Sequence, residues 1–374
     1  MRVALAHDWL TGMRGGEKVL EALCDIYPEA DIFTLLHVRG SVAPAIERHR
    51  IRTSFVQRLP AAPTKYRWYL PLFPAAVEQF DLDGYDLVIS SSHCAVKSVV
   101  PRGAARHISY SHSPMRYAWD QFDAYFGPAR VGSAASHWIY RPLLARLARW
   151  DAGTAHRVHR FVANSNHVAG RIRRYYNRQA TTVYPPVDTA FYQPDRIVPD
   201  SHFLIVSALV PYKRIEIAID ACARAGAPLR IVGDGPARAD LERRAAAHPG
   251  ARIEFLGWQI PEQIRDEYRR AAAVLMPGEE DFGIVPVEAQ ACGRPVVALA
   301  RGGVLETVTD GETGVLVAEP TAEAFAAAFD RVARASFDTE RLRTHALRFS
   351  RERHIARMRD VIDETLAAPV GARW

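Results

Sequence analysis

The sequence lacks an apolar run long enough to span a bilayer, so no transmembrane helix is expected. Residues 1–6 lead directly into a strand pattern without the build of a signal peptide, and we expect a cytoplasmic protein. Cysteine is scarce, and its spacing suits neither a zinc site nor a disulfide framework. We expect all the cysteines to be small core residues: Cys24, Cys94, Cys222 and Cys292.

Several enzyme motifs are also missing. The glycines within 12–16 and 233–235 do not have the spacing of a dinucleotide-binding fingerprint, which argues against an NAD enzyme. There is no Walker phosphate loop and no His-Glu-x-x-His zinc motif. Asp81 and Asp83 imitate a metal-binding Asp-x-Asp, but they precede a strand instead of closing one. We therefore expect a helix-to-strand turn there and no catalytic metal.

The net charge is +6, yet the arginines are spread along amphipathic helices and no nucleic-acid-binding motif is present. An acidic lipid or a phosphate is therefore a better-suited partner than a nucleic acid. The sharpest basic cluster lies within 57–74, where Arg58, Lys65 and Arg67 are mixed with aromatic residues. Such a mixture suits the headgroup layer of an anionic membrane, and it is equally typical of a loop whose aromatics belong to the core. The aromatic residues are Tyr66, Trp68, Tyr69 and Phe73.

Short apolar strands alternate with helical segments twice along the 374 residues, a pattern that predicts two α/β domains with parallel sheets. A proline-rich stretch at 184–199 is the predicted linker, so the domains are 1–183 and 200–350. Strands are expected near 2–7, 31–36, 86–91, 107–111, 160–163, 203–207, 229–232, 252–256, 273–276, 295–298 and 314–317.

Two carboxylates, Glu280 and Glu288, flank a loop-to-helix junction. Gly283 permits close backbone approach there, and Pro286 suits a first helical turn. The N–H groups that open such a helix can hold a phosphate, while the carboxylates can accept hydrogen bonds from hydroxyls on either side of it. A sugar, a diphosphate and a ribose would need that arrangement. Spacing alone also allows a solvated loop residue and an exposed helical residue.

The segment 280–288 resembles the Glu-x7-Glu signature of the retaining family 4 glycosyltransferases, which have the GT-B fold of two Rossmann-like domains facing each other across a cleft. Segments at 207–214, 232–236, 255–258 and 311–317 follow the order and distances of that family. The first half is similar to the mannosyltransferases of O-antigen and exopolysaccharide assembly. This narrower resemblance rests on 7–18, 110–120, 163–165 and 184–188.

By this resemblance, Glu280 holds hydroxyls of the donor sugar and Glu288 holds the ribose. His112 follows an expected strand, where the family places a histidine beside the donor sugar and its anomeric carbon. By residue type alone, a buried structural histidine is the alternative. Asn164 and Ser165 are expected to cap the helix that follows them.

The family binds the donor diphosphate with cations and backbone donors, because negative charge on the leaving group grows in the transition state. The resemblance makes Lys213 the cation. The other donor-binding residues that it implies are Phe282, Gly283 and Ile284 through their N–H groups, Ser207 and Arg214 in the diphosphate loop, and Trp258 and Gln259 against the base.

One position departs from the family pattern. Family members carry an arginine five places before the lysine of the diphosphate loop, and Ala208 stands there. Arg214 would point about 100° away from that lysine at a helix start. We therefore predict Arg14 as the second cation, reaching the diphosphate on domain closure, with a solvated loop arginine as the alternative. Gly15 and Gly16 would let acceptor or phosphate approach the backbone, or would mark only a tight turn.

Together these implications predict a retaining glycosyltransferase that moves mannose from GDP-mannose onto a lipid-linked glycan of bacterial surface polysaccharide, at the inner face of the cytoplasmic membrane. A UDP-sugar donor is the nearest alternative. A nucleotide-sugar epimerase of the GT-B fold and a non-catalytic binding protein also remain open. No cofactor beyond the nucleotide sugar is expected. By the same resemblance, 351–374 would form a helix that crosses back to the first domain.

Overall fold

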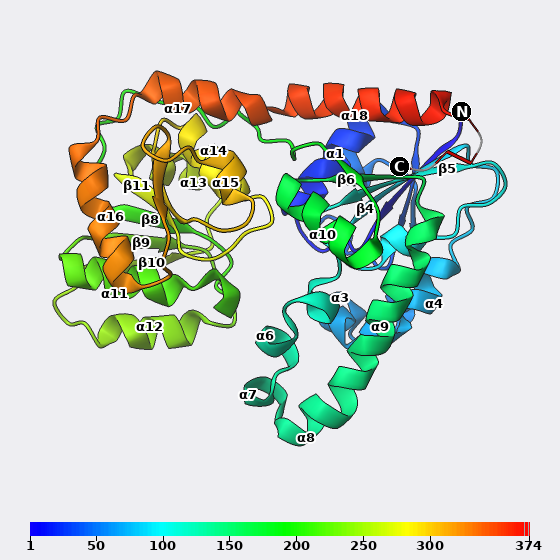
Figure 1. The fold of residues 1–374 in the computed structure, drawn as a ribbon, viewed down its shortest axis with the longest axis horizontal. Coiled ribbons are helices and arrows are strands. Elements are labelled where there is room, and N and C mark those ends of the chain that lie inside the picture. The colour runs from blue at the N-terminus through cyan, green and yellow to red at the C-terminus, as the bar shows by residue number, and fades with distance from the viewer. Residues whose placement is uncertain (370, 373) are drawn as a thin grey trace. The chain divides into compact units, whose positions relative to one another are not determined.

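The computed structural model describes residues 1–369, 371, 372 and 374 (Figure 1). The chain divides into two compact units. The first combines Met1–Pro186 with Glu352–Trp374, and the second is Val187–Arg351.

The expected linker, 184–199, does not stand apart from these units, because its first three residues belong to the first unit and the rest to the second. The tail expected at 351–374 is helical over α18 (Arg351–Ala367). Val370 and Arg373 of that tail lie outside the described residues.

The first unit contains a parallel sheet of seven strands in the order β3-β2-β1-β4-β5-β6-β7. Its central strands read as continuous runs of apolar and small residues, and every residue of β1 and β4 is buried. Such runs are typical of parallel strands covered on both faces. The strands are β1 (Val3–His7), β2 (Asp31–Thr34), β3 (Ile51–Thr53), β4 (Leu87–Ser92), β5 (Arg106–Ser111), β6 (Arg160–Ala163) and β7 (Ala180–Thr182).

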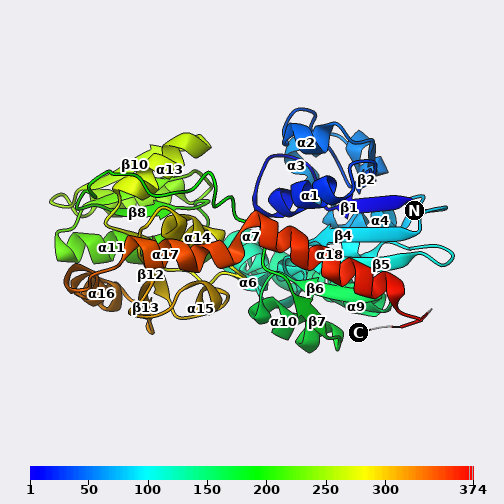
Figure 2. The ribbon, with the colours of Figure 1, turned by 90° about the horizontal axis from the view of Figure 1, so that it is seen from above.

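Helices cover both faces of this sheet. On one face α1 and α18 lie side by side (Figure 2), and Leu20, Leu23 and Met358 pack in one core with Leu5 and Ile89 of the sheet. The second core, on the other face, includes residues of α4 and α9. The helices of this unit are α1 (Gly15–Ile26), α2 (Pro44–Glu47), α3 (Ala62–Lys65), α4 (Phe73–Glu78), α5 (Arg116–Trp119), α6 (Phe122–Phe126), α7 (Pro128–Val131), α8 (Ser133–Ala135), α9 (Arg141–Gly153), α10 (Asn166–Tyr176) and α18.

The second unit contains a parallel sheet of six strands in the order β10-β9-β8-β11-β12-β13. Its strands are β8 (Phe203–Val206), β9 (Leu229–Val232), β10 (Ile253–Gly257), β11 (Ala273–Met276), β12 (Val296–Leu299) and β13 (Gly314–Val317). Its helices are α11 (Ile215–Ala225), α12 (Arg238–Ala246), α13 (Pro261–Arg270), α14 (Ile284–Ala291), α15 (Val304–Thr307), α16 (Ala322–Arg334) and α17 (Thr339–Ala346).

Every strand expected from the sequence is present, so the alternation of apolar strands and helices predicted the α/β class of both units. Two strands were missed, β3 and β7, which have three residues each and form the two edges of the first sheet. An edge strand pairs with a neighbouring strand on one side only, so its residues are less buried and it needs no apolar run. No helix in the described part of the chain has the length and apolar character that a membrane crossing needs.

Two smaller predictions are confirmed. The cysteines are all buried, as expected of small core residues. Asp81 and Asp83 lie in the turn between α4 and β4, where the Asp81 carboxylate accepts a hydrogen bond from the Asp83 N–H at 3.2 Å. This side-chain bond is typical of a turn.

Candidate active site

In a doubly wound sheet, ligands bind at the carboxyl edge where the strand order reverses. In the second unit that place lies between β8 and β11. The loop after β8 and the loop after β11 meet there. A Cβ on Gly278 would lie 2.7 Å from the Tyr212 carbonyl oxygen and 2.8 Å from Lys213 Cα. Only glycine allows the two loops to come this close.

The contact between these loops carries two of the predicted catalytic residues. Lys213 ends a short 3-10 helix (Pro211–Lys213), and its Nζ donates a hydrogen bond to Glu280 Oε1. Both side chains are largely buried, with exposed fractions of 19% and 12%. The structure therefore brings Lys213 and Glu280 together as a direct ion pair.

The backbone of Glu280 is held from its other side by the loop that follows β12. The Gly303 N–H donates to the Glu280 carbonyl at 2.7 Å. Gly302 has a φ of +72°, and a Cβ there would lie 2.3 Å from the same oxygen. The loop of Glu280 is thus fixed by neighbours on both sides, which orders its carboxylate.

The predicted loop-to-helix junction is confirmed. Gly283, with a φ of +87°, precedes α14, and Ile284 is the first helical residue. Pro286 lies in the first turn, where a missing N–H costs little. The Phe282 ring is buried and packs against Phe349 at 5.6 Å between ring centroids, so a ligand can reach Phe282 only through its backbone.

Glu288 is buried within α14, so an exposed helical glutamate is ruled out. The Tyr268 hydroxyl donates a hydrogen bond to its carboxylate at 3.0 Å. Burial, with the Glu288 charge beside it, raises the pKa of Tyr268 well above its ordinary value, so Tyr268 remains a donor. Glu288 therefore has a structural partner in addition to the predicted ribose role.

The remaining donor-binding candidates of the second unit lie in loops after β8 and β10. Ser207 is tightly packed, because a Cβ on Gly233 would lie 1.9 Å from its carbonyl oxygen. Trp258 is 72% exposed beyond the edge strand β10, and Gln259 Nε2 donates to the Leu256 carbonyl at 2.8 Å.

The expectation for Arg214 was wrong in its geometry. Arg214 is the residue before α11 and has a φ of +54°, in the left-handed region. The 100° step between neighbouring helical residues therefore does not describe how Lys213 and Arg214 are arranged. An arginine in this conformation is strained relative to glycine or asparagine.

In the first unit the strand order reverses between β1 and β4. Asp8, directly after β1, is fully buried, and its carboxylate accepts hydrogen bonds from the backbone N–H groups of the segment after β4. The four distances lie between 2.6 and 3.0 Å. Asp8 therefore ties the two loops of this switch point together. The donors are His93, Cys94, Ala95 and Val96.

His112 lies directly after β5, and its Nε2 is 2.9 Å from Ser91 Oγ. Burial lowers its pKa well below the ordinary histidine value, and the nearby imidazoles act in the same direction. His112 is therefore neutral at physiological pH. A Cβ on Gly16 would lie 3.3 Å from His7 Cε1 and 3.5 Å from His112 Nε2, so Gly16 packs over these two rings.

The start of α1 is as predicted. Gly15 is its first residue, and Arg14 precedes it with an exposed side chain. The Arg14 N–H donates to Glu17 Oε2 at 3.0 Å. The backbone at Arg14 is thus anchored, while its guanidinium is exposed.

The helix cap predicted at 164–165 is confirmed for one residue only. Ser165 Oγ accepts from the Val168 N–H at 3.0 Å. Asn164 makes other contacts: its Oδ1 accepts from the Ser165 hydroxyl at 3.3 Å, and its amide nitrogen donates to the His112 carbonyl at 3.0 Å. Asn164 thus supports His112, a role that only the pairing of β5 with β6 creates.

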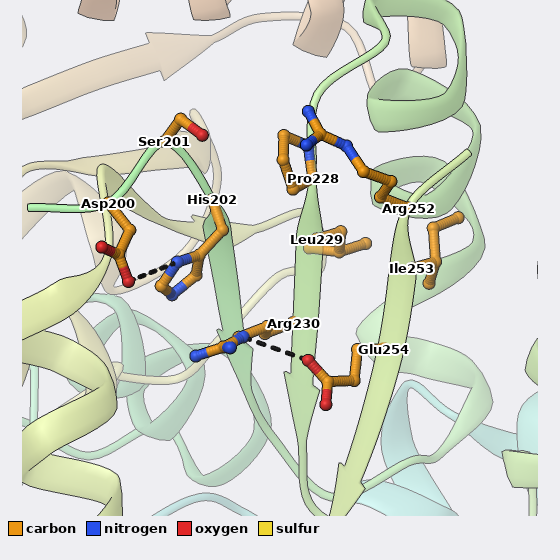
Figure 3. A pocket seen from close by; sticks show the side chains of 9 residues that line it. All are labelled: Asp200, Ser201, His202, Pro228, Leu229, Arg230, Arg252, Ile253 and Glu254. Carbon is orange, nitrogen blue, oxygen red and sulfur yellow. Dashed lines mark hydrogen bonds and ion pairs between the residues drawn. The ribbon is translucent and has the colours of Figure 1, made fainter. Parts of the chain in front are cut away.

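A cavity of about 380 Å³ lies at the opposite, amino-terminal edge of the second sheet (Figure 3). Its polar side chains contact one another, since Arg230 Nε is 3.2 Å from Glu254 and His202 Nδ1 is 3.7 Å from Asp200. This cavity lies away from Lys213 and Glu280 and is not part of the candidate site. Among the described residues, no group of three or more acidic, histidine or cysteine side chains could hold a metal ion.

Comparison with solved structures defines the fold. HepE of Anabaena in complex with UDP matches 97% of this chain and 100% of that chain, with a TM-score of 0.70 at 18% identity. Sucrose-phosphate synthase of Thermosynechococcus elongatus matches 99% and 100%, with a TM-score of 0.74 at 19% identity. The protein therefore has the GT-B fold of two Rossmann-like domains.

Sequence comparisons give the family. The family model described as "Glycosyltransferase Family 4" matches residues 13–191, and the model described as "Glycosyl transferases group 1" matches residues 193–348. D-inositol 3-phosphate glycosyltransferase of Rhodococcus erythropolis is 34% identical over 46% of this chain and 45% of that protein. An uncharacterised glycosyltransferase of Methanocaldococcus jannaschii is 34% identical over 30% and 32%. The matches span less than half the length of these relatives. The chain belongs to the family 4 glycosyltransferases.

Proposed function

We propose that the protein transfers a hexose from a nucleoside-diphosphate donor to an acceptor glycan with retention of the anomeric configuration. The observation that carries this proposal is the pairing of Lys213 with Glu280 at the carboxyl edge of the second sheet, where the strand order reverses. A cation for a diphosphate and a carboxylate for sugar hydroxyls are thereby joined in one place. Membership of a glycosyltransferase family supports the same reaction.

The chemistry follows from the charge of the leaving group. As the bond to the anomeric carbon breaks, negative charge grows on the diphosphate, and Lys213 and the first N–H groups of α14 stabilise it. Glu280 accepts hydrogen bonds from sugar hydroxyls, and these bonds strengthen as the ring gains positive charge. The acceptor hydroxyl attacks from the face that the diphosphate leaves, and a departing phosphate oxygen takes its proton. No protein nucleophile is required.

The donor that we propose is GDP-mannose, on the strength of the first-half segments that resemble mannosyltransferases. A UDP-hexose is the second candidate, because HepE of Anabaena has been solved with UDP and with UDP-glucose on the same fold. A nucleotide-sugar epimerase is the third, because the GT-B fold also hosts that activity.

The acceptor that we propose is a lipid-linked glycan at the inner face of the cytoplasmic membrane. The segment around α3 supports this, because its aromatics divide into two sets. Tyr66 and Phe73 are buried in the core, whereas Trp68 is 72% exposed, and the aliphatic Leu72 is 40% exposed. Lys65 Nζ lies 4.2 Å from the centre of the Trp68 ring, so an exposed cation accompanies the exposed indole. Such a pair suits the headgroup layer.

A panel of labelled GDP-mannose, UDP-glucose and UDP-N-acetylglucosamine, incubated with a bacterial lipid-linked glycan extract, tests the proposal. Transfer of label from GDP-mannose is expected, and it should persist with a chelator because no metal takes part. Label moved only from a UDP-sugar selects the second donor. An interconverted nucleotide sugar without transfer identifies an epimerase, and binding without turnover identifies a binding protein. Glu280→Ala serves as the inactive control.

A further inference from the structure

Four buried or half-buried side chains of the first unit form a chain that ends at His112. Ser91 Oγ is 2.9 Å from His112 Nε2 and 3.1 Å from His7 Nδ1. The other ring nitrogen of His7, Nε2, lies 3.7 Å from Glu17 Oε1. His7 and Ser91 are fully buried, and Glu17 is 3% exposed. The order is therefore Glu17, His7, Ser91, His112.

Which atom donates and which accepts in each of these contacts follows from the hydrogen-bonding capacity of each side chain. Burial acts to raise the pKa of Glu17, but the interactions with His7, the nearby His93 and a backbone hydrogen bond together outweigh burial and lower the pKa, so Glu17 is a carboxylate that can only accept. His7 Nε2 has no hydrogen-bond partner among the described residues and faces this carboxylate. A neutral His7 therefore carries its proton on Nε2 and accepts at Nδ1 from the single proton of Ser91. Ser91 Oγ must then accept from His112 Nε2.

We infer that Glu17, His7 and Ser91 are positioning residues that hold His112 in the tautomer with its proton on Nε2, so that Nδ1 presents a lone pair. His112 Nδ1 then accepts a hydrogen bond from a ligand hydroxyl and cannot donate one to that ligand. The ligand class is a polyol with a hydroxyl as donor, which rests on the proposed function for its identity as the donor hexose. A group with only acceptors, such as a phosphate oxygen, is disfavoured at this nitrogen.

Neighbouring residues hold these four side chains in place. A Cβ on Gly16 would lie 3.3 Å from the His7 ring and 3.5 Å from the His112 ring, so the start of α1 lies close to both rings and restrains them. Glu17 belongs to the same turn, and its second oxygen, Oε2, accepts the Arg14 N–H at 3.0 Å. One oxygen of Glu17 thus serves the helix start while the other serves His7.

Because Glu17 accepts at one oxygen and faces His7 with the other, Glu17→Gln tests the inferred tautomer of His112. The Arg14 N–H needs an acceptor, so the amide oxygen of the substituted side chain takes that place and its NH2 group turns to His7. The NH2 group donates to His7 Nε2, the His7 proton moves to Nδ1, and the Ser91 hydroxyl donates to His112 Nε2. The proton of His112 is then on Nδ1. Ser91→Ala removes the link and leaves both tautomers populated.

Histidine nitrogen NMR on isotope-labelled protein at about pH 8, where an unperturbed imidazole is neutral, distinguishes a protonated from a bare ring nitrogen. His112→Gln assigns the signal. The matched control is Ser90→Ala: Ser90 is the neighbour of Ser91 on β4, is equally buried, and its Oγ lies 2.9 Å from His107 Nε2. We expect the His112 proton on Nε2 in the wild type and in Ser90→Ala, on Nδ1 in Glu17→Gln, and on both in Ser91→Ala. A wild-type proton on Nδ1, or an unchanged tautomer in Glu17→Gln, overturns the inference.

Activity gives a second readout. For the nucleotide sugar that supports transfer in the donor panel, kcat/KM should fall roughly 5- to 100-fold in Glu17→Gln and Ser91→Ala, because a ligand hydroxyl loses its acceptor. Ser90→Ala should stay within about 2-fold of the wild type. If no sugar is transferred, the proposed function fails while the tautomer measurement still decides the inference. Wild-type transfer by Glu17→Gln with a reversed tautomer overturns the role of His112 as acceptor and leaves the proposed function standing.

Discussion

Lys213 donates a hydrogen bond to the carboxylate of Glu280, which lies 67 residues further along the chain. The two residues are assigned to different parts of the donor, the lysine to the diphosphate and the glutamate to the sugar. Their opposite charges neutralise each other. Under the proposed function, donor binding exchanges this one contact for two, because diphosphate oxygens take the lysine and sugar hydroxyls take the glutamate.

Glu280→Gln separates these two roles. Without the charge of Glu280, Lys213 is held less tightly, and GDP should bind about 5-fold more tightly, the equivalent of a partly exposed ion pair of about 1 kcal/mol. Transfer should slow, and Glu280→Ala should lose roughly 30- to 1000-fold in turnover. Calorimetric titration with GDP and steady-state transfer assays measure both. The neighbouring, exposed Glu279→Gln is the control. Wild-type turnover in a stably folded Glu280→Ala would remove Glu280 from the mechanism.

Glu288→Ala should reduce both stability and turnover, with a smaller effect on turnover than Glu280→Ala. Its removal leaves the buried Tyr268 hydroxyl without this acceptor, at a cost of about 1–3 kcal/mol in the free energy of unfolding. Tyr268→Phe breaks the same hydrogen bond and keeps the carboxylate. Urea unfolding and transfer assays on both variants separate the roles: a ribose contact predicts weaker nucleotide binding in Glu288→Ala than in Tyr268→Phe. Equal nucleotide affinity in the two variants would contradict that contact.

Arg14→Ala should weaken donor binding and turnover about 10-fold, because an exposed guanidinium before α1 is the predicted second cation for the diphosphate. The backbone N–H of residue 14 still reaches Glu17 in the variant, so the helix start is kept. Arg48→Ala, which removes an exposed arginine of the same unit, is the control. Normal donor affinity and turnover in Arg14→Ala would leave this arginine as a solvated loop residue.

Replacing Arg58, Lys65 and Arg67 with glutamine should reduce co-sedimentation with anionic vesicles and flatten its dependence on salt. Each cation near the membrane surface contributes about 1 kcal/mol. The control replaces three exposed arginines of the second unit with glutamine: Arg224, Arg243 and Arg334. Equal losses of vesicle binding in both triple variants would show a nonspecific charge effect. Unchanged vesicle binding in the first variant would mean that the segment has only a structural role.

Lowering the pH should destabilise the first unit through His107. Burial lowers the pKa of this fully buried histidine from 6.5 to about 3. Below pH 6.5 the unfolded chain takes up a proton that the folded state does not accept until near pH 3, so stability is complete above 6.5 and falls with the pH. At pH 5 the loss is about 2 kcal/mol. Urea unfolding at both ends of this range should show a shallower dependence in His107→Gln, and an equal slope would contradict the prediction.

The sequence alone determined the features that depend on neighbouring residues. Apolar runs such as Ala273–Met276 became strands, and Gly283 and Pro286 correctly marked the start of α14. Ser165 was identified as a helix cap for the same reason, because its acceptor and the N–H that it serves lie three residues apart. Local backbone preferences and burial decide such features, and both can be read from a short window.

Only the tertiary structure decided which polar groups meet. Asp8 accepts N–H groups from a segment more than 80 residues away, and Asn164 supports His112 instead of capping its own helix. His7, Ser91 and His112 line up because β1, β4 and β5 lie side by side in the sheet, and Glu17 is connected to His112 only through His7 and Ser91. The order of strands depends on the crossover connections and on the burial of both faces of the sheet. It cannot be predicted from a short stretch of sequence. Polar residues within otherwise apolar strands indicated that such buried side chains have partners. Only the fold identified which residues those partners are.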